Sequence, residues 1–260
     1  MGDWEGPLRL TSFALLFAVF AAIEAWKPFR PPQHRRWLAN LGLALIGSVL
    51  LRILFPLAAT GVALLAEQRA WGLFNALNWP LWFSLPLCVL LLDLAIYWQH
   101  RLFHHLPWLW RVHRVHHADT AVDVTTGLRF HPLELLLSML LKAGLIIAMG
   151  APASAVLIFE VLLNACAMFN HSNFVLPQRG ERQLRRLLIT PTLHRIHHSR
   201  RSAETNSNFG FSVSCWDRWF GSYSQEAAGG DDRVALGLPG ERQYASRLGV
   251  MLCLPFRRDR

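Results

Sequence analysis

Long apolar blocks alternate with short polar segments along the first two thirds of the chain. Three of these blocks are long enough for the ~20 residues that cross a hydrocarbon core: Leu8–Ala25, Leu38–Ala66 and Trp79–Trp98. A fourth block, Leu133–Phe169, is too long for one helix, and Gly150-Ala-Pro152 near its middle predicts the turn of a helical hairpin. The pattern therefore predicts about three spans plus a hairpin, whose arms either cross the bilayer or only dip into it.

Composition and charge favour a membrane protein over a soluble one. The 260 residues are 53% hydrophobic and only 17% charged. Basic residues follow the first span, the third span and the hairpin, whereas the connection between the second and third spans carries only Arg69 against Glu67. The positive-inside rule then places the segments that follow these blocks in the cytoplasm. We expect anionic lipid headgroups, and not nucleic acid, as the electrostatic partner of the +9 charge.

Two ionisable residues interrupt the hairpin at nearly equal distances from its turn. Helical arms would place Lys142 and Glu160 at similar depth. Because charges in a bilayer core are costly unless they are paired or hydrated, we predict a Lys142–Glu160 contact that holds the arms together. The alternative is a lysine that extends to the interface and a glutamate that faces water. The N-terminal segment lacks the basic residues of a signal peptide, so we expect the first span to be retained.

Histidines concentrate in the polar segments after the third span and after the hairpin. Eleven of the twelve lie between His100 and His198, and eight of them form three clusters: His100-Arg-Leu-Phe-His104, His113-Arg-Val-His116-His117 and His194-Arg-Ile-His197-His198. Residues three and four apart share a helix face, so each cluster directs several imidazoles to one side. Neutral imidazole is a common metal ligand, and the clusters predict a metal centre. The alternative is a protonated cytoplasmic surface, which would not need such regular spacing.

The number of imidazoles predicts two metal ions. A structural zinc site uses four protein ligands and a catalytic one three, whereas the clusters supply eight nitrogens and the isolated His131 and His171 could add two more. Nitrogen ligands suit iron, zinc or copper. Because zinc has no redox chemistry, oxidation of a lipid C–H bond next to the bilayer would require iron.

The same residues resemble the fatty acid hydroxylase/sterol desaturase superfamily from about residue 80 to residue 222. The matching motifs lie around the three clusters and at Asp93, Arg129-Phe-His131-Pro, Asn170-His171-Ser-Asn173, Thr205-Asn-Ser-Asn-Phe-Gly-Phe211 and Trp216-Asp-Arg-Trp-Phe-Gly221. The resemblance implies a membrane-bound non-haem di-iron enzyme that uses O2 and external electrons to hydroxylate or desaturate a lipid. It implies ten metal ligands, with His131 the weakest match: His100, His104, His113, His116, His117, His131, His171, His194, His197 and His198. No catalytic residue beyond these ligands is predicted.

The expected fold class is all-α, an integral membrane helical bundle with a cytoplasmic histidine-rich helical cap. We expect residues 1–99 to form an N-terminal membrane anchor and residues 100–222 to form the catalytic region, including the membrane hairpin 133–169. Residues 223–260 would form a C-terminal tail, and the whole chain would act as one domain. The absence of Gly-x-Gly-x-x-Gly and of a cysteine ligand set predicts a separate reductase or ferredoxin-like electron donor.

Carboxylates near the clusters are candidates to orient the imidazoles, because metal-bound histidine usually donates its second N–H to a carboxylate or carbonyl. The candidates are Asp93, Asp119, Asp123 and Glu134, and the alternative for each is a helix cap or a solvated charge. We predict that His34 and His105 are surface residues. Two alternative functions remain: an acyl-lipid type desaturase, and a membrane metal-binding or transport protein without redox catalysis.

Overall fold

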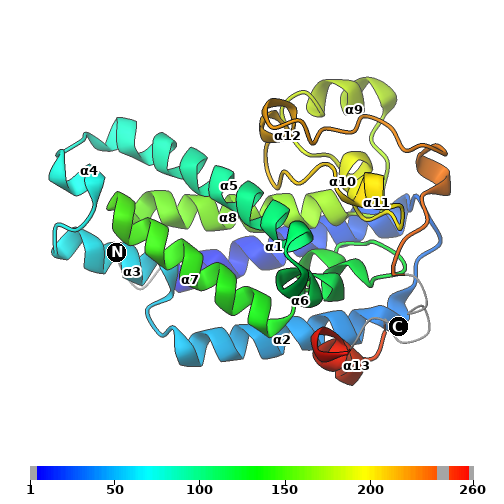
Figure 1. Cartoon of the computed structure of the whole chain (residues 1–260), viewed down its shortest axis with the longest axis horizontal. Helices are drawn as coiled ribbons and strands as arrows, with labels where there is room; N and C mark the ends of the chain where they lie inside the picture. Colours follow the sequence, from blue (N-terminus) through cyan, green and yellow to red (C-terminus); the bar gives the residue numbers. More distant parts are fainter. Residues whose placement is uncertain (1–4, 239–245, 258–260) are drawn as a thin grey trace.

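Long helices that run in roughly one direction form the body of the molecule, and short helices form a cap at one end (Figure 1). The computed structural model describes residues 5–238 and 246–257, which are helical apart from loops and two isolated β-bridges. The five longest helices are α1 (Glu5–Trp26), α2 (Trp37–Leu54), α5 (Leu81–His105), α7 (Pro132–Met149) and α8 (Ala153–His171).

The predicted membrane bundle is confirmed. Five segments are long and apolar enough to cross a membrane: α1, residues 34–76, α5, α7 and α8. Large apolar side chains cover their outer faces; Leu45 of α2 and Leu140 of α7 are both exposed. Apolar side chains that face water cost free energy, whereas the hydrocarbon core of a bilayer would remove them from water.

The predicted span over Leu38–Ala66 lies within residues 34–76, which form one of the five candidate spans, but it is not one continuous helix. The structure divides it into α2 and α3 (Ala58–Gln68), which are separated at Phe55–Leu57. Pro56 cannot donate a backbone hydrogen bond, and Ala58 has a positive φ of 52°, so the chain changes direction here. The helix α3 then packs on α7 and α8, and Ala59 and Ala63 are fully buried in the apolar core.

The helical hairpin is confirmed, and its turn is formed as the sequence indicates. Gly150 adopts a left-handed conformation at the end of α7, and Pro152 immediately precedes α8. The predicted contact is also present, because Lys142 Nζ lies 3.0 Å from Glu160 Oε1. Arg9 of α1 lies 2.5 Å from the other oxygen of Glu160, so three helices meet at one carboxylate.

The cap consists of short helices from the segments between and after the spans. These are α6 (Pro107–His117), α9 (Gln178–Leu184), α10 (Pro191–His197), α11 (Ser202–Thr205), α12 (Cys215–Trp219) and α13 (Leu248–Cys253). Buried apolar contacts join α13 to α2 and α6 through Leu43, Val115 and Met251. At the opposite end of the bundle, α4 (Leu73–Ala76) lies near the hairpin turn.

Gly72 and Gly150 make a close backbone contact at this opposite end. Gly72 has φ 91° and ψ 166°, a conformation that is almost confined to glycine. A methyl group on Gly72 would lie 2.0 Å from the backbone nitrogen of Gly150 and 2.4 Å from the oxygen of Ile147. The contact therefore fixes the segment before α4 against the hairpin.

We predict that Gly72→Ala lowers the stability of the bundle. Alanine in this conformation costs about 1–3 kcal/mol, and its methyl group would also displace the hairpin turn. The matched control is Gly144→Ala, because a methyl group there meets no neighbour within 4 Å. Thermal unfolding of both variants in detergent tests the prediction, which fails if both unfold at the wild-type temperature.

Candidate metal centre

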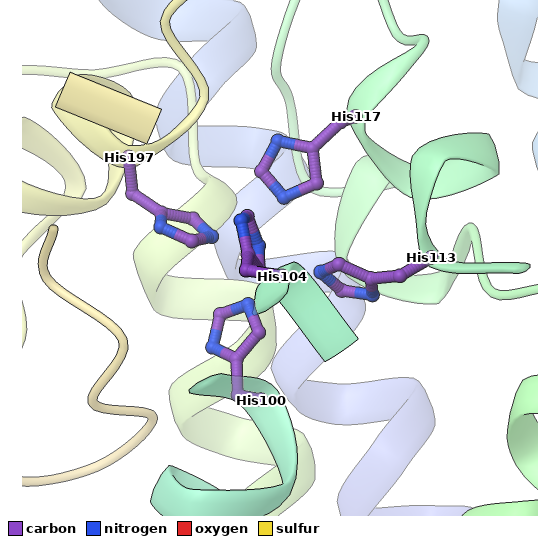
Figure 2. Close-up of side chains that lie close together, drawn as sticks. All are labelled: His100, His104, His113, His117 and His197. Carbon is purple, nitrogen blue, oxygen red and sulfur yellow. The ribbon is translucent and has the colours of Figure 1, made fainter. Parts of the chain in front are cut away.

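Nine buried or half-buried imidazoles form two adjoining groups where the cap meets the ends of α5 and α8. A five-histidine group contains His100, His104, His113, His117 and His197, and a four-histidine group contains His116, His171, His194 and His198. Within each group, one ring nitrogen of every residue lies within 4.8 Å of the others. Figure 2 shows the five-histidine group, with the rings of its members gathered around that of His104.

The helix ends bring these residues together, and each His-x-x-His-His cluster contributes to both groups. On α6, His113 and His117 are one turn apart and point into the five-histidine group, whereas His116 belongs to the four-histidine group. Residues one position apart differ by about 100° around a helix, so neighbouring histidines face different points. As a result the groups touch: the rings of His117 and His198 stack with centroids 4.5 Å apart.

Hydrogen bonds fix the tautomer of several rings. The Nδ1 atoms of His100, His171 and His197 lie 2.7, 2.6 and 2.8 Å from the backbone oxygens of Phe209, Ala167 and Ser207. His116 Nδ1 lies 3.3 Å from the Arg129 oxygen in the same way. Since a carbonyl oxygen can only accept, Nδ1 carries the proton in these rings and Nε2 keeps its lone pair.

The lone pairs then face one another, which is the arrangement that a metal ion requires. His116 Nε2 lies 3.0 Å from His171 Nε2, although neither atom carries a proton to share. Nε2 of His194 and of His198 lie 2.9 and 3.2 Å from the same atom of His171. Among the described residues, Nε2 of each member of the five-histidine group is buried without a hydrogen-bond partner. A metal cation at the centre of each histidine group would accept the lone pairs of these nitrogens, so the residues present fit two metal ions.

Burial favours the neutral form of five of the cap histidines. It lowers the pKa of His197 to about 3 and, with the neighbouring imidazoles, holds the pKa values of His116 and His194 well below the ordinary 6.5. His117 and His198 are affected in the same way. Metal binding requires neutral imidazole, and these rings do not form the protonated surface that was the alternative.

The structure does not bring His131 to either group. His131 precedes α7 and caps it, since its Nδ1 accepts a 3.1 Å hydrogen bond from the backbone nitrogen of Leu133. Its Nε2 lies 3.2 Å from the oxygen of Leu252, near the C-terminal end. We therefore leave His131 out of the ligand set proposed below. His34 and His105 are exposed, as predicted.

Of the four candidate carboxylates, only Glu134 contacts a histidine of the centre. Its Oε1 lies 2.7 Å from His113 Nδ1, and both side chains are buried. The prediction for Asp93 is wrong, because Asp93 instead accepts a 2.8 Å hydrogen bond from the indole of Trp216. Helical periodicity placed Asp93 on the face of His100, but the indole from the later part of the chain occupies the space beside it.

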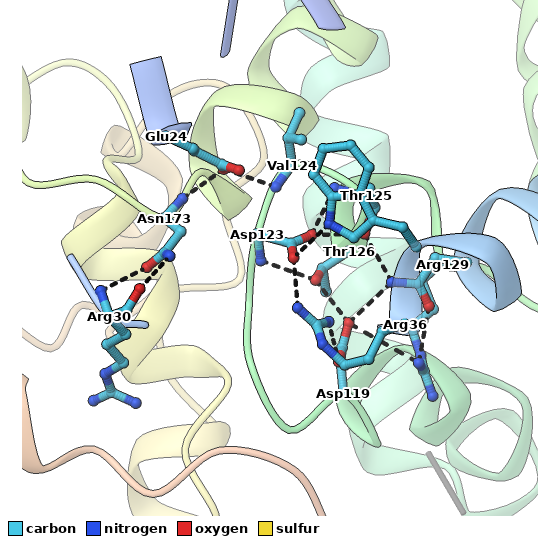
Figure 3. Close-up of polar contacts among 12 residues, drawn as sticks. Glu24, Arg30, Arg36, Asp119, Asp123, Val124, Thr125, Thr126, Arg129 and Asn173 are labelled. Carbon is cyan, nitrogen blue, oxygen red and sulfur yellow. Dashed lines mark hydrogen bonds and ion pairs between the residues drawn. The ribbon is translucent and has the colours of Figure 1, made fainter. Parts of the chain in front are cut away.

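Asp119 and Asp123 contact arginines and not histidines of the centre, and the sequence did not indicate this role for the arginines (Figure 3). Arg36, at the start of α2, forms buried ion pairs with both carboxylates. Burial opposes ionisation of Asp119, but the charges of Arg129 and Arg36 outweigh it and lower the Asp119 pKa. The fully buried Arg129 side chain donates to Asn40 Oδ1 at 2.9 Å. Because the Arg129 backbone oxygen accepts from His116, this network orients a member of the four-histidine group.

A second anchor ties α1 to the same region. Glu24, in the last turn of α1, accepts hydrogen bonds from the backbone nitrogens of Val124 (2.8 Å) and Asn173 (2.6 Å). Asn173 lies two residues after His171. No local pattern in the sequence connects Glu24 or Arg36 with residues about 80 to 150 positions further on, so nothing in the sequence pointed to these roles.

Two cavities with different lining residues reach the five-histidine group. A cavity of about 480 Å³ within the bundle is lined by His100 and His113 at one end and by Lys142 and Glu160 at the other. A cavity of about 280 Å³ in the cap is lined by His104 and His117, with Arg200, Thr205 and Asn206 among its other residues. The first is mostly apolar and the second is mostly polar in its side chains.

Comparison with known proteins agrees with this site. The profile of the fatty acid hydroxylase family matches residues 85–222, which is more than half of the chain and includes all nine histidines of the two groups. The chain belongs to the fatty acid hydroxylase family. The resemblance noted in the sequence is thereby confirmed. No solved structure matches the chain.

Several curated proteins are similar to this member of the family. The ornithine lipid hydroxylase OlsE of Rhizobium tropici is 31% identical over 146 residues, which cover 56% of this chain and 43% of that protein. The alkylglycerol monooxygenases of Homo sapiens and Danio rerio are 27% and 29% identical and align with 88% and 68% of this chain. These alignments cover 49% and 38% of the two monooxygenases, so the chain spans about half or less of its relatives' length.

We predict that Glu134→Ala weakens metal retention about 10- to 100-fold, as is typical when a group that orients a ligand is lost. The His113 ring would lose the acceptor of its Nδ1–H bond and with it a fixed orientation. The control is His131→Asn, which keeps a capping side chain on α7 but removes the imidazole. Titration with a chelator measures how tightly each of the two variants retains metal. Equal loss of metal from His131→Asn would instead identify His131 as a ligand.

Proposed function

We propose that this protein is an O2-dependent lipid oxidoreductase that hydroxylates a C–H bond at a centre of two iron ions. The observation that carries the proposal is the pair of adjoining histidine groups, of which the five-histidine group lies at an apolar cavity within a membrane bundle. The proposed ligands are the five-histidine group for one ion and the four-histidine group for the other.

The choice of iron rests on the chemistry of the donor set and on the relatives. Imidazole nitrogens suit iron, zinc and copper alike, but zinc cannot support a redox reaction. The relatives are named as a hydroxylase and as monooxygenases, which favours oxygen insertion over desaturation. Bound iron would supply the activation of O2, and the side chains around it have separate tasks.

The chain itself would position the lipid and exclude water. The cavity of about 480 Å³ leads to His100 and His113 and is lined largely by apolar side chains, among them Phe103, Met139 and Phe211. A lipid carbon held beside these histidines would be the reacting atom, and the buried surroundings would protect it from competing reactions with water.

Electrons would come from a separate donor on the cytoplasmic side. The histidine groups lie at the cap end of the spans, together with most of the arginines, and the positive-inside rule assigns this end to the cytoplasm. A metal transporter would be expected to place its ligands near the bilayer midplane. The position of both groups in the cap therefore favours catalysis over transport.

We predict about two irons per chain in freshly purified protein, measured by mass spectrometry of the metal content. His104→Ala should selectively lower the occupancy of one site and His194→Ala that of the other, because the two residues belong to different groups. His105→Ala is the matched control, since His105 is next to His104 but exposed. A chain without iron, or equal metal in all three variants, would contradict the proposed centre.

We predict that filling the apolar cavity abolishes lipid oxidation without loss of iron. Ser138→Trp places a large side chain in the cavity from α7, whereas Leu140→Trp adds the same side chain to the exposed, lipid-facing surface of that helix. Oxygen-dependent product formation from a lipid extract should fall at least about tenfold in the first variant only. Equal activity of the two variants would show that substrate reaches the centre by another route.

A further inference from the structure

Charged side chains line the end of the apolar cavity that lies away from the histidines. They are Arg9 of α1, Lys142 of α7 and Glu160 of α8. Their side chains are largely buried, at 28%, 15% and 13% exposed. In membrane-spanning helices, ionisable residues that face an internal cavity mark a functional site more often than a structural one.

Cations outnumber carboxylates at this end of the cavity. Glu160 is shared, since its Oε1 lies 3.0 Å from Lys142 Nζ and its Oε2 lies 2.5 Å from Arg9 Nη2. Arg52 of α2 adds a third cation at the exposed edge of the cavity. Glu5 pairs with Arg9 at 3.4 Å but does not line the cavity. Among the residues that line the cavity, the three cations Arg9, Lys142 and Arg52 compare with the two carboxylates Glu160 and Glu134, so a bound anion would improve the charge balance.

A structural lock between the hairpin arms does not account for this arrangement. The Lys142–Glu160 pair alone would hold α7 to α8, and an isolated pair needs neither a further arginine nor a cavity beside it. The rest of the cavity wall is mostly apolar and includes Phe13, Ile96 and Leu163. A volume of about 480 Å³ is within the usual range of ligand pockets, which are mostly apolar with a few polar groups that fix orientation.

We propose that this cavity binds a lipid with an anionic head group, a carboxylate or a phosphate, at Arg9 and Lys142, with its chain directed toward His100 and His113. Glu160 holds the two cations in place, and Arg52 contributes charge at the edge. Lys142 lies eight residues after Glu134 on α7, which is ~12 Å along the helix axis. This separation would select the carbon that reaches the centre, a consequence that rests on the proposed function.

Binding measurements with chain-matched ligands test the inference without turnover. The probes are palmitate, hexadecyl phosphate, hexadecanol and hexadecylamine, added to the purified full chain in a neutral detergent and followed by thermal stabilisation. We expect at least one of the two anions to bind about tenfold or more tightly than the alcohol. The tighter of palmitate and hexadecyl phosphate identifies the head group. An alcohol or amine that binds as tightly as both anions overturns the inference.

Two variants assign the preference to the cavity. Lys142→Met should reduce anion affinity about tenfold and leave hexadecanol affinity unchanged, whereas Arg69→Gln, a cation outside this cavity, should retain the wild-type preference. An unchanged anion preference in Lys142→Met overturns the inference. If Lys142→Met does not fold, the comparison of the two anions with hexadecanol on the wild-type protein still decides whether the cavity prefers an anionic lipid.

Iron content measured on the same sample separates this inference from the proposed function. Anion preference in a chain that binds no iron would support the lipid site and remove the di-iron reaction. Two irons without anion preference would leave the reaction in place and overturn the lipid site.

Discussion

The convergence of unprotonated imidazole nitrogens is the constraint on which the rest of the cap depends. The Nε2 atoms of His116 and His171, which lie 3.0 Å apart with no proton between them, repel, and each is also removed from water. The fold tolerates this because the Nδ1 sides of several of these rings bind carbonyl or carboxylate oxygens that fix their orientation. The ends of α5, α6, α8 and α10 meet at this point, so three separate parts of the sequence, α5–α6, α8 and α10, are coupled through these histidines.

The N-terminal helices contribute to the centre as well as to the membrane bundle. The family profile begins at residue 85, yet Arg36 and Asn40 of the preceding segment hold Asp119 and Arg129 in place. Glu24 does the same for the loops that follow His117 and His171. Buried charges without partners cost several kcal/mol each, so the position of these loops depends on the first two helices. The segment expected to form the membrane anchor therefore also supports the site.

Sequence periodicity was sufficient where neighbouring residues decide the structure. Gly150 and Pro152 predicted the hairpin turn, and equal distances from that turn predicted the Lys142–Glu160 pair. The spacing of the histidines predicted that the members of each cluster share a helix face. It could not predict which histidines form which group, because the grouping depends on how α6 and α10 face each other. Long-range contacts explain what the spacing did not predict: Trp216 occupies the partner position of Asp93, and the break at Pro56 within the second span allows α3 to pack on α7 and α8.

The two cavities give the five-histidine group two different environments. His100 and His113 face an apolar space inside the bundle, whereas His104 and His117 face a polar space in the cap. A lipid and small polar reactants such as water or protons partition in opposite directions, since apolar groups leave water and charged groups remain in it. An oxidation at this centre needs both kinds of reactant at one point. Separate approaches from the membrane and from the cap would let them meet at the histidines without sharing a path.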